Sequence, residues 1–158
     1  MPPRGPWTSA TLIAGTLLAS LVLNVLPLRV DYAWLRPEWP LLVLVFWTIH
    51  SPTDVGVGSA WLLGLVLDGI EGSPLGQHAM ALSVVSFLVL SLHTRLSFFS
   101  LLQQSLVIVM LVAVYHVFSI WIQNVSAIAT GNLLFLWSCL TSALCWPLIR
   151  ILLGKIAA

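Results

Sequence analysis

Charged residues are scarce in this chain. They make up 7% of its 158 residues, whereas 59% of the residues are hydrophobic and the mean hydropathy is +1.05. In a typical soluble domain about a quarter of the residues are charged, so this composition would leave a water-exposed surface with too few polar groups. We therefore identify the chain as an all-α integral membrane protein whose residues 1–158 form a single transmembrane domain.

Basic clusters and paired cysteines are also missing. Six basic and five acidic residues give a net charge of +1 without a basic run, which argues against nucleic-acid binding and against a polybasic lipid-binding tail. The apolar composition makes membrane lipid the expected surrounding partner. The two cysteines, Cys139 and Cys145, project from opposite sides of one predicted helix, so they cannot form a disulfide bond with each other.

Six apolar runs predict a bundle of six transmembrane helices. The first run would extend about 31 Å as a helix, which is enough for one crossing of the hydrocarbon core. The second and third runs are too short to cross unaided. They form either two short helices sheltered by longer neighbours or one re-entrant hairpin. The predicted helices cover approximately residues 8–28, 38–50, 54–68, 77–93, 100–123 and 133–153.

The distribution of lysine and arginine indicates the orientation. Loops on the cytoplasmic side of a membrane carry an excess of these residues. Six crossings that start in the cytoplasm place four cations inside: Arg4, Arg95, Arg150 and Lys155. Only Arg29 and Arg36 then lie outside, each near an acidic residue. We expect both termini to be cytoplasmic, since five crossings would move Arg150 and Lys155 to the outer side.

Two carboxylates, Asp68 and Glu71, interrupt apolar sequence near the middle of the chain. An acidic side chain costs roughly 2.5 to 3.5 kcal/mol at the bilayer centre, so such residues lie at an interface or face protein. The orientation puts both at the outer surface, as solvated loop charges or as partners of Arg29 or Arg36. A shared cation or acid–base role is the weaker interpretation of their spacing. We hypothesise that an outer group orients a protein partner; it consists of Arg29, Asp31, Arg36, Glu38, Asp68 and Glu71, with Trp39 beside it.

Small residues recur every four positions on the third predicted helix, at Gly56, Ala60 and Gly64. In a membrane, small residues let two helix backbones approach closely. This stripe therefore predicts helix packing, or a backbone-lined cavity that ends at Asp68.

The fifth predicted helix carries a polar face formed by Ser105, His116, Ser119 and Gln123. His116 is interpreted as an interhelical hydrogen-bonding group or as a contact with a partner's membrane helix; a proton relay is the weaker alternative, because further ionisable partners are missing on this helix and the next. Neither a metal-ligand cluster nor a set of nucleophile, base and orienting residue is visible, so we expect no catalytic, cofactor or metal site.

Several motifs occur in register between Arg36 and Val107. They are Arg36-Pro37-Glu38-Trp39-Pro40-Leu-Leu-Val-Leu-Val-Phe-Trp47, Val55-Gly-Val-Gly58, Gly64-x-x-Leu67-Asp68, Gly72-Ser73-x-Leu75-Gly76 and Gln103-Gln104-x-Leu106-Val107. Together they resemble the motifs of the bacterial rod shape-determining protein MreD family. The resemblance continues less specifically to Trp146-Pro147 and so covers nearly the whole chain.

This resemblance implies a non-enzymatic inner-membrane component of the cell-elongation complex that binds MreC. MreC would link MreB filaments to RodA and penicillin-binding protein 2, and so to peptidoglycan synthesis. The resemblance also implies the six-helix fold of the S components of energy-coupling-factor transporters, which supplies an alternative function as a small-molecule-binding transporter subunit. A vitamin pocket needs several convergent polar groups inside the bundle, whereas the charges of this sequence stay at the borders of the apolar runs. We therefore favour the assembly role.

Overall fold

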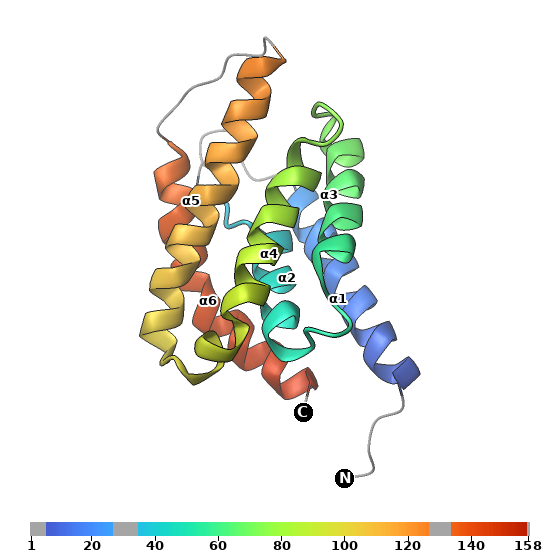
Figure 1. Ribbon diagram of the computed structural model, residues 1–158, viewed down its shortest axis with the longest axis vertical. Coiled ribbons are helices and arrows are strands. Elements are labelled where there is room, and N and C mark those ends of the chain that lie inside the picture. The colour runs from blue at the N-terminus through green and yellow to red at the C-terminus, as the bar shows by residue number, and fades with distance from the viewer. Residues whose placement is uncertain (1–5, 27–34, 127–133, 158) are drawn as a thin grey trace.

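Six α-helices form one bundle in the computed structural model, which describes residues 6–26, 35–126 and 134–157 (Figure 1). The fold in these ranges is entirely helical, without a β-strand, as the sequence predicts. The helices are α1 (Pro6–Val25), α2 (Trp39–His50), α3 (Val57–Glu71), α4 (Gln77–Phe98), α5 (Leu101–Val125) and α6 (Phe135–Ala157).

The observed helix bounds differ most from the prediction in three helices. The third helix begins and ends three residues later than the predicted range 54–68, because Gly56 caps its start and Gly72, with φ +66°, ends it. The fourth and sixth helices continue to Phe98 and Ala157. Their predicted ends were placed where the sequence becomes polar, but polar residues without proline can continue a helix into the interface. The predicted end of the first helix, at 27–28, lies outside the described residues.

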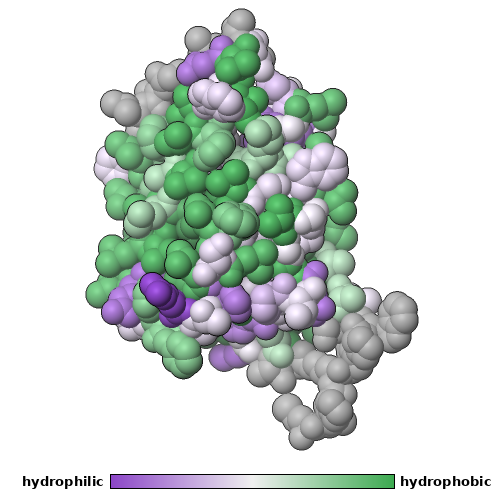
Figure 2. Space-filling model, viewed as in Figure 1, coloured by the Kyte–Doolittle hydropathy of each residue, from purple (hydrophilic) through white to green (hydrophobic). Residues whose placement is uncertain are grey.

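Three of the described helices, α4, α5 and α6, are long and apolar enough to cross a membrane. Shorter apolar helices cover Ala10–Val25 and Trp39–His50. Hydrophobic residues cover the middle of the face seen in Figure 2, and hydrophilic residues gather towards its ends. This distribution suits a protein whose flanks contact hydrocarbon and whose ends contact water.

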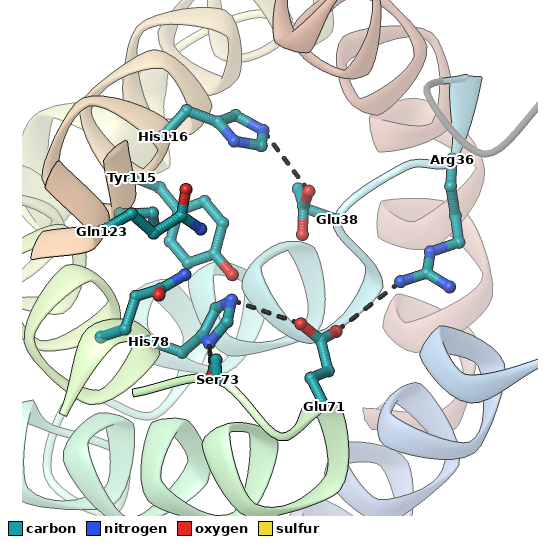
Figure 3. A pocket seen from close by; sticks show the side chains of 10 residues that line it. Arg36, Glu38, Glu71, Ser73, His78, Tyr115, His116 and Gln123 are labelled. Carbon is teal, nitrogen blue, oxygen red and sulfur yellow. Dashed lines mark hydrogen bonds and ion pairs between the residues drawn. The ribbon is translucent and has the colours of Figure 1, made fainter. Parts of the chain in front are cut away.

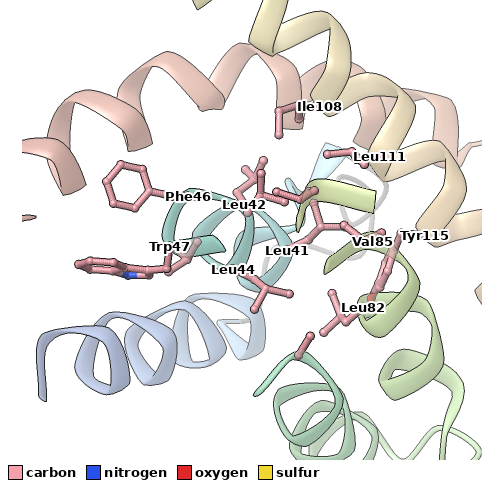
Figure 4. Close-up of a cluster of buried hydrophobic side chains, with 14 of the residues drawn as sticks. Leu41, Leu42, Leu44, Phe46, Trp47, Leu82, Val85, Ile108, Leu111 and Tyr115 are labelled. Carbon is pink, nitrogen blue, oxygen red and sulfur yellow. The ribbon is translucent and has the colours of Figure 1, made fainter. Parts of the chain in front are cut away.

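The second helix, α2, lies in the interior of the bundle. Nine of its twelve residues are buried, from Pro40 to Thr48, and it contacts α1, α4 and α6. A helix that is apolar on every side is typical either of a protein core or of a membrane span, and the burial of α2 places it in the core of the bundle. Figure 4 shows its Leu42 and Phe46 among buried side chains of neighbouring helices. Of the two alternatives that the sequence left open for this run, the structure has a short helix sheltered by its neighbours.

A buried glutamine joins three helices at the end of the bundle where α4 ends and α5 begins. The Gln104 side chain donates to the carbonyl of Leu96 at 2.7 Å, and its Oε1 accepts from Trp146 at 3.1 Å and Arg150 at 2.8 Å. Because Gln104 is only 3% exposed, these bonds satisfy an amide that would otherwise be costly to bury.

The third and fourth helices are in closest contact at Gly64. A Cβ atom added to Gly64 would overlap the backbone of Ala79 on α4. Ala60, one turn earlier, is fully buried, and Gly56 precedes the helix as its N-cap. The close approach of two backbones thus requires glycine at position 64.

We expect Gly64→Ala to destabilise the protein, because one methyl group would force α3 away from α4. Overpacking of this kind costs about 1–3 kcal/mol, which corresponds to a fall of about 2–10 °C in the melting temperature. The measurement is thermal unfolding of the detergent-purified protein. Gly58→Ala is the matched control, since nothing lies within 4 Å of a Cβ at Gly58 and its melting temperature should be unchanged or higher. Equal melting temperatures for the two variants would refute the packing argument.

Candidate functional site: a polar cavity at one end of the bundle

A polar cavity of about 270 Å³ opens at the end of the bundle opposite Gln104. The segment before α2, the end of α3, the start of α4 and the second half of α5 enclose it (Figure 3). Its lining residues are Arg36, Glu38, Glu71, Ser73, Gln77, His78, Tyr115, His116, Ser119 and Gln123.

Asp68 lies behind this lining and is only 1% exposed. Its Oδ1 accepts hydrogen bonds from the Ser73 hydroxyl at 2.8 Å and the His78 backbone at 2.9 Å, and lies 2.7 Å from the Nδ1 of His78. Its Oδ2 accepts from the Gly76 backbone at 2.8 Å. A carboxylate accepts but cannot donate, so the imidazole that fits this site carries its proton on Nδ1.

The turn between α3 and α4 places Asp68 at the start of the fourth helix. Gly72 and Gly76 have positive φ angles of 66° and 98°, which glycine adopts without a steric penalty. Between them the chain reverses within five residues and returns beside the end of α3. The first amides of a helix lack intrahelical partners and carry a partial positive charge, so a buried carboxylate is stabilised there.

A chain of ionisable groups leads from His78 to the mouth of the cavity. The Nε2 of His78 lies 3.4 Å from one oxygen of Glu71, and the other oxygen lies 3.6 Å from the Arg36 guanidinium (Figure 3). Asn24 of α1 donates to that second oxygen at 2.6 Å. Glu71 therefore connects α1, α4 and the segment before α2.

Glu38 faces His116 on the other side of the cavity. Its Oε1 lies 3.4 Å from the Nε2 of His116, and Ser138 and Ser142 of α6 hold the 36–38 segment through its backbone. Burial, together with the negative charge of Glu71, raises the pKa of Glu38 to about 7, although the Arg36 charge and the Ser138 hydroxyl oppose the shift. Glu38 thus gains or loses its proton near neutral pH.

Three buried polar atoms on lining residues make no hydrogen bond within the part of the chain that the structure describes. They are Gln77 Oε1, His116 Nε2 and Ser119 Oγ. Buried polar atoms without partners are uncommon in folded proteins, and each calls for an explanation.

The structure brings part of the hypothesised outer group together. Arg36, Glu38 and Glu71 line one cavity, and Glu71 is paired with Arg36, which was one of the alternatives for this carboxylate. The expectation that Asp68 lies in a solvated loop is wrong, because the α3–α4 turn folds over it. Arg29 and Asp31 lie outside the described residues.

The remaining predicted residues are divided between the cavity and the helix flanks. His116, Ser119 and Gln123 line the cavity, whereas the Ser105 hydroxyl bonds to the carbonyl of Leu101 near the other end of α5. Trp39 lies in an apolar groove between α1 and α6 instead.

Sequence reasoning did not assign Ser73, Gln77, His78 and Tyr115 to a site. A signal was present for the first three, because Gly72 and Gly76 indicate a tight turn that must bring the start of α4 back to Asp68. Tyr115 precedes His116 and offered no such signal. Among the residues that the structure describes, no group of three or more His, Cys, Asp or Glu side chains could hold a metal ion.

The match to a family model and the match to a curated relative indicate the same family. Residues 7–156 match the family model described as rod shape-determining protein MreD. The chain is 31% identical over 144 residues to the rod shape-determining protein MreD of Haemophilus influenzae, which covers 91% of this chain and 89% of that protein. No solved structure shows significant similarity.

We expect Asp68→Ala to destabilise the protein, because it leaves the amides of Gly76 and His78 buried without their acceptor. Each unsatisfied group costs about 1–3 kcal/mol. Asp54→Ala, which removes an exposed carboxylate at the other end of α3, is the matched control. Thermal unfolding in detergent should show a clear fall in melting temperature for the first variant only. A stable Asp68→Ala protein would show that the turn does not depend on the carboxylate.

The raised pKa of Glu38 predicts a pH dependence of stability. The folded protein binds this proton more tightly than the unfolded chain, whose Glu pKa is near 4.5, so the stabilisation is complete below about pH 4.5 and is lost as the pH rises through 7. The full change amounts to roughly 3 kcal/mol. Thermal unfolding of wild type and Glu38→Gln between pH 5 and 8 should show stability falling with pH more steeply in the wild type. Parallel profiles would contradict the shift.

Proposed function

Since the chain belongs to the MreD family of rod shape-determining proteins, we propose that it binds MreC as a non-enzymatic inner-membrane component of the cell-elongation complex. In this proposal MreC links it to MreB filaments, RodA and penicillin-binding protein 2, and so to peptidoglycan synthesis. The observation that carries the proposal is the family match, which extends over residues 7–156 and therefore includes all six helices.

We further propose that both termini are cytoplasmic. The first helix begins and the sixth ends at the same end of the bundle (Figure 1). The described cations Arg95, Arg150 and Lys155 lie in the last turns of α4 and α6, towards that end. The positive-inside rule supports this end as the cytoplasmic one, which makes the polar cavity an outer-side feature.

The polarity and volume of the cavity can be compared with those that the alternative function, a vitamin-binding transporter subunit, would need. Polar groups do converge there, contrary to our expectation from the sequence, and the volume of about 270 Å³ is close to the lower end of the usual range of about 300–1,000 Å³ for small-molecule sites. The preference for the assembly role therefore rests on the family match and not on the size of the cavity. The likeness to the S-component fold stays a prediction.

Partner binding in this proposal combines apolar flanks with the outer group. An apolar groove between α5 and α6, with Leu106, Leu140 and Leu144 in its wall, could receive a partner's membrane helix. The half-exposed Arg36–Glu71 pair at the outer end would orient the partner where it leaves the membrane. Asp68 serves this role indirectly, by holding the α3–α4 turn.

We expect Arg36→Ala to lower the yield of MreC that co-purifies with the protein at least threefold, because it removes the described cation at the cavity mouth. Arg95→Ala, which removes an exposed arginine at the other end, should retain the wild-type yield. Size-exclusion chromatography in detergent should confirm that both variants are folded before yields are compared. Wild-type yield from folded Arg36→Ala would remove Arg36 from the interface.

A further inference from the structure

We propose that the polar cavity binds an ammonium or guanidinium group that comes from outside this chain. The inference does not depend on the proposed function. It rests on the charge of the lining, on its unpartnered acceptors and on its size.

The described lining has an excess of negative charge. Glu38 and Glu71 face one cation, Arg36, and Asp68 adds a further carboxylate directly behind His78. When Glu38 is ionised, the two carboxylates of the lining outnumber its guanidinium group by one. A buried or half-buried charge of this kind is stabilised by a nearby cation.

The unpartnered polar atoms favour a ligand that donates hydrogen bonds. Gln77 and Ser119 are 2% and 5% exposed, and the free atoms on both side chains, Gln77 Oε1 and Ser119 Oγ, can accept a hydrogen bond. Glu38 adds carboxylate oxygens on the same cavity wall as His116. Ammonium and guanidinium groups carry only donors, so they match this set, whereas an anion would meet carboxylates and acceptors.

Size and aromatic surroundings fit the same chemistry. A volume of about 270 Å³ accepts a small cationic group together with a few waters, each of which occupies about 30 Å³ in the liquid. Tyr115 belongs to the lining, and aromatic side chains attract ammonium and guanidinium groups. The described residues offer no metal-ligand cluster that would favour a metal ion instead.

Cation binding should strengthen with pH. Because Glu38 has a pKa of about 7, a bound cation competes with its proton and binds better at pH 8 than at pH 6. Among the described residues, the other titratable or charged groups near it are Arg36 on its own segment, Glu71 from α3, His78 from α4, Tyr115 and His116 from α5, and Cys139 from α6.

The test measures the melting temperature of the detergent-purified protein in methylammonium chloride at constant ionic strength. Tetramethylammonium, which has the same charge but no N–H donor, is the ligand control. We expect methylammonium to raise the melting temperature by about 3 °C more than tetramethylammonium at saturation. The difference should be larger at pH 8 than at pH 6. It should fall by more than half in Glu38→Gln/Glu71→Gln and persist in Asp54→Asn.

Ser119→Ala keeps the test decisive if the double variant does not fold, because it removes one acceptor without changing charge and should still reduce the response. Equal responses of wild type, Ser119→Ala and the double variant would overturn the proposal. The proposal would also be overturned if methylammonium raised the melting temperature of Arg29→Gln but not of the wild type. In that case Arg29 of the chain itself would supply the cation in the wild type.

Two further measurements distinguish the sources of the group. A small amine found by native mass spectrometry in wild type, and absent from the double variant, identifies a free ligand. Carbodiimide coupling of Glu38 or Glu71 to a lysine of co-purified MreC identifies a partner side chain. If the isolated wild-type protein shows no methylammonium response but still binds MreC, this inference is overturned and the proposed function stands.

Discussion

The burial of one carboxylate, Asp68, organises the end of the bundle that holds the polar cavity. The buried charge of Asp68 is stabilised by hydrogen bonds, whose donors belong to the α3–α4 turn and to the start of α4. These bonds hold the end of α3 and the start of α4 together. This fixation orients His78, which in turn faces Glu71. The cavity therefore has a rigid wall because a charge has been placed where water does not reach.

The sequence predicted the helices well because hydrocarbon imposes a simple requirement. A helix that crosses alone needs a long apolar run, which is visible without knowledge of tertiary contacts, and α4, α5 and α6 have such runs. The shorter α2 and α3 were recognised as apolar runs between turn residues. The positive-inside rule also grouped Arg36, Glu38 and Glu71 at one end, which the structure brings together around the cavity. Helix ends were less well predicted, because α4 and α6 continue past the apolar residues into polar ones.

The inside of the site could not be predicted in the same way. Helical periodicity gives the direction in which a side chain points around the helix axis, but two side chains on the same face can lie far apart along that axis. Ser105 was therefore grouped with His116 although about 16 Å of helix separates them. The burial of Asp68 depends on two left-handed glycines that close one turn, and the hydropathy of the sequence carries no such information. His78 seemed isolated because its partner lies across that turn.

The enclosure of α2 has a consequence for biogenesis. At twelve residues it extends about 18 Å, well short of the bilayer core, and its cover includes α6, which follows the other five described helices along the chain. Two hydroxyls of α6, on Ser138 and Ser142, hold the residues just before α2. A nascent chain that stops before α6 thus has an incompletely covered central helix, although all the residues of α2 have already been made.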